Sequence, residues 1–420
     1  MGRRTLLLLL PLLPGTLGGL LCAALIGGCS APPATPDAYT LQARQQPDFP
    51  AMQALGRQLF FDPMLSASGR QSCASCHDPA HAYGPPNDLA VQLGGPDGRT
   101  PGLRAAPSLR YLQNLPPFTE HRFDEDVDES IDQGPAGGYN WDGRAASIHA
   151  QSALALLSMR EMANGSAAAL LPRLRAAPYA AQFRAVFGAD ALDEAGTALQ
   201  WASLALESFQ QDAAEFYPYS SKYDAVLRGQ ATLSAAEQRG LALFNGPAKG
   251  NCAACHPSSI GAGTGAFPAF TDHGFINIGV PRNRRLPANA DPGFFDLGLC
   301  GPERRDLQDK PEYCGAFRTP SLRNVAQRHA FFHNGRFGTL EEVMRFYVTR
   351  DTAPQDWYAR AADGALRRFD DLPDSLRGLP AMVNTDPPFD RQPGEPPALS
   401  EAEIADVIAF LKTLSDGYKR

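Results

Sequence analysis

The chain carries two copies of the pentapeptide Cys-x-x-Cys-His, at residues 73–77 and 252–256. Two thiols at this spacing can bond the two vinyl groups of one haem, and the histidine that follows can ligate its iron. The residues are Cys73, Cys76 and His77 in the first copy and Cys252, Cys255 and His256 in the second. A zinc site completed by distant residues is the alternative for each copy. We predict two covalently bound c-type haems, because two complete motifs occur on a chain that its first residues mark for export.

The first thirty residues have the pattern of a signal peptide rather than of a membrane span. Two arginines precede an apolar run, and the run ends at Ile-Gly-Gly-Cys, residues 26–29. This sequence resembles a bacterial lipobox, so we expect residues 1–28 to be removed, Cys29 to receive lipid and residues 29–50 to form a flexible tether. Ser30 after the cysteine favours sorting to the outer membrane, which predicts a lipid-anchored periplasmic protein. Ordinary cleavage nearby would instead give a soluble periplasmic protein.

The remaining cysteines predict a disulfide. Of the eight cysteines, Cys22 leaves with the signal peptide, Cys29 takes lipid and four take haem, which leaves Cys300 and Cys314. In an oxidising compartment such a pair forms a disulfide, and closing a loop of about 15 residues stabilises a fold by roughly 3 kcal/mol on the chain-entropy model. Two unpaired buried thiols are the alternative. Neither cysteine lies in a Cys-x-x-Cys spacing, which indicates a structural role.

Composition indicates a globular protein with 44% hydrophobic and 20% charged residues and a net charge of −7. The mature chain of about 390 residues is long enough for two domains with separate cores. The acidic balance, and the absence of a Lys and Arg cluster from the sequence, argue against nucleic acid as a partner.

The two halves of the chain share a short repeat ahead of each haem motif. Gly-x-x-Leu-Phe occurs at residues 56–60 and again at residues 240–244, in both cases where a helix should lead into the haem loop. The repeat predicts two cytochrome c-like domains in a mainly α fold. Two Pro- and Gly-rich stretches, residues 84–101 and 261–268, are predicted to form loops around the haems.

Capping signals give the domain limits. Ser234 and Glu237 have the spacing of a capping box, which puts the boundary near residue 232. We therefore expect an N-terminal haem domain at residues 51–232 and a C-terminal haem domain at residues 233–420. A second capping box starts a final helix with one apolar stripe. Its residues are Ser400 and Glu403 for the cap and Ile404, Val407, Ile408, Leu411 and Leu414 for the stripe.

Longer motifs resemble one family over nearly the whole mature chain. In the first half these are Trp141-Asp142-Gly143-Arg144, then Gln151, then Glu161-Met162; in the second half they are residues 318–324, 332–335 and 339–342. Together they resemble the bacterial di-haem cytochrome c peroxidase and MauG family, which implies two haems that face the domain interface. The runs at residues 298–302, 314–315 and 347–351 look most like the MbnH-type branch, which is associated with a separate protein partner.

The resemblance assigns roles at the first haem. Peroxide cleavage needs an open iron position and a base that moves a proton between the two oxygens. The family pattern implies Glu161 as this base and Gln151 as its polar neighbour, whereas a helix-capping or solvated glutamate is the alternative. The loop at residues 89–102 contains no histidine that could block the iron. His81 is poorly placed to do so, and His121 is expected in solvent beside Glu120, so we predict a first haem that is open in the resting protein.

At the second haem the resemblance implies Tyr347 as the ligand opposite His256, as in MauG. Met344 is the rival, because it lies one helical turn earlier on the same face. A tyrosinate ligand stabilises higher oxidation states, whereas methionine suits the acceptance of electrons. Trp141 matches the tryptophan that relays electrons between the haems, while Trp201 and Trp357 are expected in packing roles.

Whether a calcium ion binds between the haems stays open. Relatives hold it partly through an asparagine before Pro-Ser-Leu, where this chain has Ala105, although backbone carbonyls and water could still suffice. The acidic stretch at residues 120–132 carries seven Asp or Glu residues, either as a solvated loop or as a docking site for a partner.

Three functions remain in view. In the first, hydrogen peroxide reacts at the first haem and both haems share the oxidising equivalents to oxidise a tryptophan or tyrosine of a periplasmic partner protein. In the second, a cytochrome c peroxidase reduces peroxide to water with electrons from a small cytochrome or cupredoxin. The third is a non-enzymatic two-haem electron carrier, which would leave Glu161 without a task. The residues favour a peroxide-dependent di-haem oxidoreductase.

Overall fold

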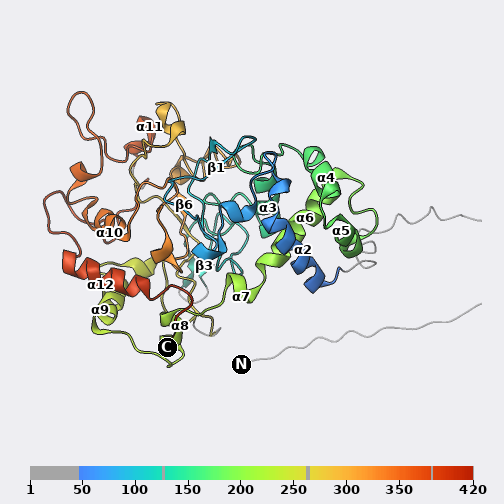
Figure 1. The fold of residues 1–420 in the computed structure, drawn as a ribbon. Helices are drawn as coiled ribbons and strands as arrows, with labels where there is room; N and C mark the ends of the chain where they lie inside the picture. Colours follow the sequence, from blue (N-terminus) through green and yellow to red (C-terminus); the bar gives the residue numbers. More distant parts are fainter. Residues whose placement is uncertain (1–46, 125–127, 262–264, 380–381, 420) are drawn as a thin grey trace, which may run out of the picture. The chain divides into compact units, whose positions relative to one another are not determined.

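The structure, a computed structural model, describes residues 47–124, 128–261, 265–379 and 382–419 (Figure 1). The predicted signal peptide, Cys29 and most of the predicted tether lie outside the described residues. The first described helix, α2, spans Phe49–Phe61, so it begins two residues before the predicted start of the first domain. Contacts group Pro47–Arg420 into one compact unit.

The described chain is mainly helical, as predicted. Its first half contains α2, α3 (Ile148–Leu157), α4 (Ala167–Ala176), α5 (Ala180–Phe187), α6 (Ala195–Gln210) and α7 (Ala213–Phe216). Its second half contains α8 (Lys222–Leu227), α9 (Ala235–Asn245), α10 (Leu340–Thr349), α11 (Asp374–Arg377) and α12 (Glu401–Lys412). The longest of these helices surround two hydrophobic cores. The buried residues of the first core come from positions 52–216 of the chain, and those of the second come from positions 223–414.

In the part of the chain that the structure describes, the strands form three short antiparallel pairs. They are β1 (Leu93–Gly94) with β2 (Thr100–Pro101), β3 (Phe123–Asp124) with β4 (Asp128–Asp132), and β5 (Phe275–Ile276) with β6 (Phe317–Arg318). Registers pair Leu93 with Pro101 and Phe275 with Arg318. The strands therefore shape loops between helices and do not form a layer of their own.

One helix crossing in each core depends on a glycine of the Gly-x-x-Leu-Phe repeat. Helix α2 packs on α6, and a Cβ at Gly56 would overlap the backbone oxygen of Ala205. Helix α9 packs on α12, and a Cβ at Gly240 would overlap the backbone oxygen of Asp406. Figure 1 shows α9 beside α12 and α2 beside α6. The repeat therefore marks two equivalent close crossings.

The phenylalanine of the repeat begins an aromatic cluster in each core. Phe60 makes edge contacts with rings from the haem loop and from α6, and Phe244 does the same with its haem loop and α12. The clusters are Phe60, Tyr83 and Phe209 in the first core and Phe244, Phe270 and Phe410 in the second, with ring centroids 5.3–6.5 Å apart. Each cluster joins the helix crossing to the chain that follows the haem motif.

A second repeat, Pro-Ser-Leu-Arg, begins at Pro107 and again at Pro320. The hydroxyl of Ser108 donates to the carbonyl of Ala82 at 2.6 Å, and that of Ser321 donates to the carbonyl of Ala269 at 2.6 Å. The leucine N–H groups bind the carbonyls of Tyr83 and Phe270 in the same way, at 3.1 and 3.3 Å. The repeat therefore fixes the chain after each haem motif.

The predicted capping signals are confirmed. Ser234 with Glu237 caps α9 and Ser400 with Glu403 caps α12, each with both reciprocal hydrogen bonds. The predicted apolar stripe from Ile404 to Leu414 is buried, although α12 ends at Lys412. The N-termini of α9 and α12 agree with the prediction from the sequence because a capping box depends only on two residues three positions apart.

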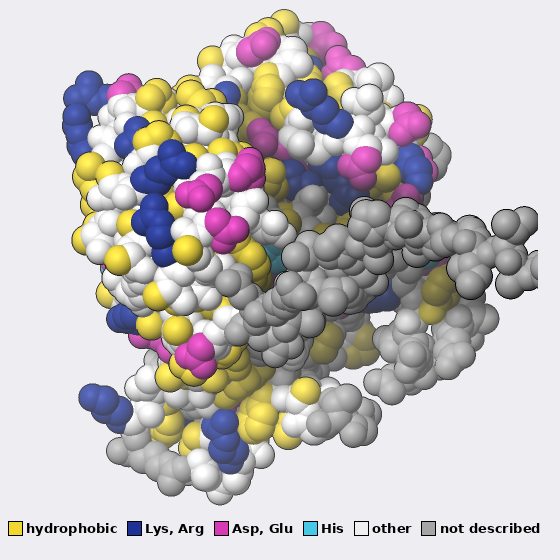
Figure 2. Space-filling view, turned by 90° about the vertical axis from the view of Figure 1, so that its right-hand side faces the viewer, with side chains coloured by type: hydrophobic (Ala, Val, Ile, Leu, Met, Phe, Trp, Pro, Cys, Tyr) yellow, Lys and Arg dark blue, Asp and Glu magenta, His cyan; other side chains and the backbone are white. Residues whose placement is uncertain are grey.

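The molecular surface in Figure 2 carries Lys and Arg side chains interspersed with Asp and Glu on the face shown. Among the described residues, no helix is both long enough and apolar enough to span a lipid bilayer.

Adding a methyl group at the first helix crossing should destabilise the fold. Gly56→Ala forces α2 away from α6 and should lower the free energy of unfolding by about 1–3 kcal/mol, because overpacking outweighs the better helix propensity of alanine. Gly378→Ala is the matched control, since a Cβ at Gly378 meets no atom within 4 Å. Denaturant unfolding of the two variants checks this, and equal midpoints would contradict the role of the crossing.

Candidate active site

The first Cys-x-x-Cys-His motif opens on a cavity of about 190 Å³. The motif forms a short 3-10 helix, and both of its cysteines and His77 line the cavity. The Nδ1 atom of His77 lies 3.2 Å from the carbonyl oxygen of Tyr83, which leaves Nε2 for a metal. Burial lowers the pKa of His77 to about 4, so the ring is neutral at neutral pH, as a ligand to iron must be.

Glu161 and Gln151 line the same cavity. Gln151 lies on α3, and Glu161 lies on the turn that follows this helix. The hairpin of β1 and β2 holds this turn, because the N–H of Gly95 donates to the carbonyl of Glu161 at 2.9 Å. A Cβ at Gly94 would overlap the backbone of Arg160, so the close approach requires glycine. The structure thus brings together three parts of the first half that are distant in sequence.

Two charged side chains shift the pKa of Glu161 in opposite directions. Glu161 as a whole residue is exposed and lines the cavity, yet protein surrounds its carboxyl, and this desolvation raises its pKa. The guanidinium of Arg144 lowers the pKa of Glu161, and the carboxylate of Glu303 raises it. Arg144 and Glu303 also face each other, with Nη2 and Oε2 3.5 Å apart. Glu303 lines the first cavity although it belongs to the second half.

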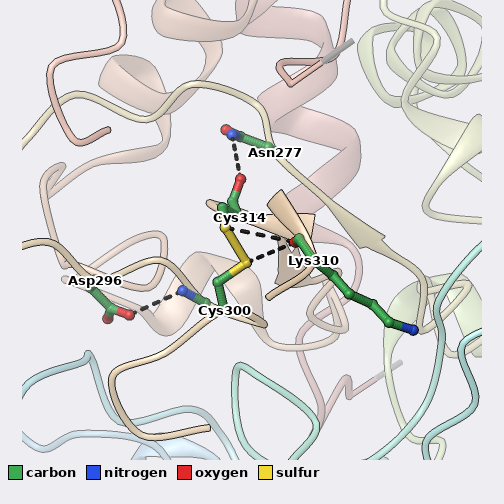
Figure 3. Close-up of a disulfide and its surroundings, with 6 residues drawn as sticks. Asn277, Asp296, Cys300, Lys310 and Cys314 are labelled. Carbon is green, nitrogen blue, oxygen red and sulfur yellow. Dashed lines mark hydrogen bonds between the residues drawn. A yellow bond between two sulfur atoms is a disulfide. The ribbon is translucent and has the colours of Figure 1, made fainter. Parts of the chain in front are cut away.

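The sequence did not reveal Glu303, because this residue lies 142 positions after Glu161 and reaches the first cavity on a loop of the second half. Cys300 and Cys314 form a disulfide that closes this loop (Figure 3). Asp296, just before the disulfide, accepts from the N–H of Gly298 at 3.2 Å. Asn277 donates to the carbonyl of Cys314 at 3.3 Å. The disulfide and these bonds shape the loop that carries Glu303.

Asp142 of the Trp-Asp-Gly-Arg motif connects this loop to the first half. Its carboxylate is fully buried between Arg104 at 2.7 Å and Arg144 at 2.9 Å. Arg104 also binds Asp296 through two bonds of 2.7 Å. Arg304 donates from the loop to the carbonyl of Asp142 at 3.0 Å. Asp142 therefore joins this loop to the first half through Arg104, Arg144 and Arg304.

Among the described residues that line the first cavity, His77 is the only histidine. His81 lines the second cavity instead, and its Nδ1 lies 3.0 Å from Asp78. His121 is exposed, as expected, but its partner is Asp132 at 2.6 Å and not Glu120, which pairs with Lys310. Met162 lines the cavity as well, with its side chain packed in the first hydrophobic core.

The second motif lines a larger cavity of about 490 Å³. Nδ1 of His256 lies 2.8 Å from the carbonyl oxygen of Phe270, so His256 is held in the same way as His77. Tyr347 and Met344 both line this cavity from α10. Burial raises the pKa of Tyr347, and its hydroxyl makes no hydrogen bond to a described residue.

Trp141 lines both cavities. Its indole N–H donates to the carbonyl of Ala105 at 2.8 Å, and its own carbonyl accepts from the N–H of Arg318 at 2.9 Å. Ala105 and Arg318 stand two residues before the two copies of Pro-Ser-Leu-Arg, so Trp141 is held between equivalent positions of the repeat. By contrast, Trp201 stacks on Phe187 at 4.8 Å within the first core.

The described residues contain no group of three or more His, Cys, Asp or Glu side chains arranged to hold a metal ion. The backbone oxygen of Ala105 is occupied by Trp141, and its N–H donates to the carbonyl of His333 at 2.7 Å. Calcium binding therefore stays open, with the family resemblance as its only support.

The chain is similar to di-haem enzymes along most of its length. Residues 50–232 match the family model described as di-haem cytochrome c peroxidase. Methylamine utilization protein MauG of Paracoccus denitrificans is 35% identical over 382 residues, which cover 89% of this chain and 90% of that protein.

This chain belongs to the di-haem cytochrome c peroxidase and MauG family. It is therefore a di-haem peroxidase-type oxidoreductase, as the resemblance implied. Two solved structures are similar to it. Diheme peroxidase BthA from Burkholderia thailandensis has a TM-score of 0.77 and 39% identity and covers 88% of this chain and 87% of its own. A MauG-like protein associated with microbial copper homeostasis has a TM-score of 0.59 and 26% identity, with 89% and 91% covered. Assignment to the MbnH-type branch stays a prediction.

Family membership implies two c-type haems, and the residues of this peroxidase fit them. The four motif cysteines form no disulfide in the structure and line the two cavities in pairs. Burial raises the pKa of Cys76 and of Cys255 to about 11, so these sulfurs are neutral thiols at neutral pH. Each histidine has Nδ1 engaged by a backbone carbonyl and Nε2 free. Thioether attachment and histidine ligation need this arrangement.

The two charges beside Glu161 should tune its acidity in opposite directions. Glu303→Gln removes a negative charge and should lower the pKa of Glu161, whereas Arg144→Gln removes a positive charge and should raise it. If the reaction with peroxide requires ionised Glu161, the acid limb of its pH–rate profile should move to lower pH in the first variant and to higher pH in the second.

Stopped-flow absorption of the haems across pH measures both profiles. Glu401→Gln is the control, because this exposed carboxylate pairs with Arg345 on the surface. Shifts in the same direction for both variants would contradict the electrostatic coupling.

Proposed function

We propose that this di-haem oxidoreductase uses hydrogen peroxide to oxidise a tryptophan or tyrosine of a partner protein. When bound, the haems supply the redox chemistry: peroxide is cleaved at the first, and the two oxidising equivalents are shared with the second. The partner loses two electrons and two protons, which balances the reduction of one peroxide to two waters. The observation that carries the proposal is the difference between the two cavities, since Glu161 faces the first and Tyr347 the second.

Glu161 is proposed as the group that moves the proton. Its ionised carboxylate takes a proton from the inner oxygen of peroxide and returns it to the departing oxygen. Gln151 lines the same cavity and can orient the peroxide by hydrogen bonding. The lack of a second histidine among the described lining residues supports an open position opposite His77, which would allow reaction without prior reduction.

Tyr347 is proposed as the second ligand of the other haem. Its hydroxyl has no hydrogen-bond partner among the described residues, and its ring packs on Phe389 with centroids 5.5 Å apart. An oxygen ligand stabilises higher oxidation states better than a sulfur ligand does. Met344 is buried in the second core one turn earlier, which supports a packing role for it. Trp141, with contact to both cavities, is proposed as the electron relay.

The remaining assignments are proposals of the same kind. The two hydrophobic cores support N- and C-terminal haem domains, but the first core ends at Phe216 and the second begins at Tyr223, which favours a division several residues before the predicted boundary near residue 232. The lipobox at residues 26–29 supports a periplasmic, lipid-anchored protein. The alternative activity, peroxide reduction with electrons from a small cytochrome or cupredoxin, shares the first site and differs in the source of the electrons.

One equivalent of peroxide added to the oxidised protein tests the proposal. In the wild type, the haem and near-infrared absorption should change without added reductant and persist. Glu161→Gln should slow this change by about 10²–10⁴-fold, because the proton transfer is lost. Tyr347→Met should react with peroxide at the first site but lose the persistent state, while Met344→Leu is the matched control and should behave as the wild type.

If peroxide reacts only after one-electron reduction of the protein, the open first site is wrong and the cytochrome c peroxidase alternative is favoured. If Met344→Leu and not Tyr347→Met removes the persistent state, the ligand assignment is wrong.

A further inference from the structure

Arg318 is a buried arginine without a counter-charge. Five arginines in the described chain have less than a tenth of their surface exposed, and four of them form an ion pair with an aspartate. These pairs are Arg282 with Asp371, Arg304 with Asp306, Arg323 with Asp224 and Arg350 with Asp351. Arg318 is 7% exposed and has no such partner among the described residues. A buried unpaired charge is costly, so its partner must come from elsewhere.

The guanidinium of Arg318 is also short of hydrogen bonds. Its Nε donates weakly to the carbonyl of Asn140 at 3.3 Å, and its Nη1 is buried without a hydrogen-bond partner. Tyr139 and His273 are the nearby titratable groups. Burial raises the pKa of Tyr139 to about 12 and lowers that of His273 to about 3, so neither carries charge at neutral pH. Burial lowers the pKa of Arg318 itself to about 10, which leaves it cationic.

The position of Arg318 indicates what the missing partner is. Arg318 lines both cavities and binds the carbonyl of Trp141 through its backbone N–H. A guanidinium pairs best with a planar carboxylate, which can accept two parallel hydrogen bonds. Each haem carries two propionate carboxylates. The equivalent position in the first copy of the Pro-Ser-Leu-Arg repeat is Ala105, so this charge is present on one side of Trp141 only.

We propose that Arg318 binds a haem propionate where the two cavities meet, and that its positive charge acts on the potentials of the haems on both sides of Trp141. A cation at this point favours the reduced over the oxidised form of each iron. The inference rests on the occupancy of both cavities by haem and is independent of which partner the enzyme oxidises.

The test uses the purified protein with its haems, in three forms: wild type, Arg318→Lys and Arg318→Gln. Haem content is measured first, since attachment through the cysteines does not need Arg318. In Arg318→Gln the propionate bending bands in the resonance Raman spectrum should shift and the haem midpoint potentials should become more negative. Arg318→Lys should retain most of the wild-type potential. Arg367→Gln, at an exposed arginine that pairs with Asp374 and lines neither cavity, should leave both potentials unchanged.

A chloride titration of the wild type separates a propionate from a free anion and needs no variant. Potentials that do not change with chloride support the proposal, and potentials that change with chloride in the wild type but not in Arg318→Gln overturn it. Unshifted Raman bands and potentials in Arg318→Gln with two haems bound overturn it as well. A wild type that binds no haem would instead contradict the proposed function.

Discussion

Two close helix crossings set the positions of the two motif histidines, on which the rest of both sites depends. At Gly56 and at Gly240 the partner helix approaches so closely that its backbone oxygen occupies the space of a side chain. The phenylalanine four residues further along each helix then meets an aromatic ring whose backbone carbonyl accepts from the motif histidine. Through this chain of contacts, the orientation of His77 and of His256 depends on the separation of two helices.

The repeated framework carries unequal chemistry. Both histidines are held by backbone carbonyls, and both Pro-Ser-Leu-Arg copies make the same serine and leucine hydrogen bonds. The differences lie in the other residues that line the two cavities. Glu161 enters the first cavity on the turn after α3, whereas Tyr347 enters the second on α10. Trp141 lies between equivalent positions of the repeat, where Ala105 on one side corresponds to Arg318 on the other.

The helix caps and several residues of the first cavity could be predicted from the sequence, because each depends on a short sequence motif. The capping boxes at Ser234 and Ser400 are confirmed because each depends on two residues three positions apart. The family resemblance likewise named Glu161, Gln151 and Trp141, and the structure brings all three to one cavity. Their chemical roles stay predictions.

What the sequence did not reveal depends on long-range packing. Glu303 reaches the first cavity only because the loop closed by the disulfide folds back onto Asp142 and Arg144. Arg318 belongs to a motif that the sequence analysis identified. Its lack of an ion-pair partner can be recognised only in the structure, where the positions of the neighbouring carboxylates are known. The close approach at Gly56 likewise involves α6, whose Ala205 lies about 150 residues away in the chain.

The proposed role of Trp141, as the link between two unequal sites, is tested most directly by freeze-quenched EPR. One equivalent of peroxide is added to oxidised wild type and to Trp141→Phe, and the ferric signals of both haems are followed in time. We predict that the two signals decline together in the wild type, and that in Trp141→Phe the first declines while the second persists. A Trp141→Phe protein in which both signals decline together at the wild-type rate would contradict the account.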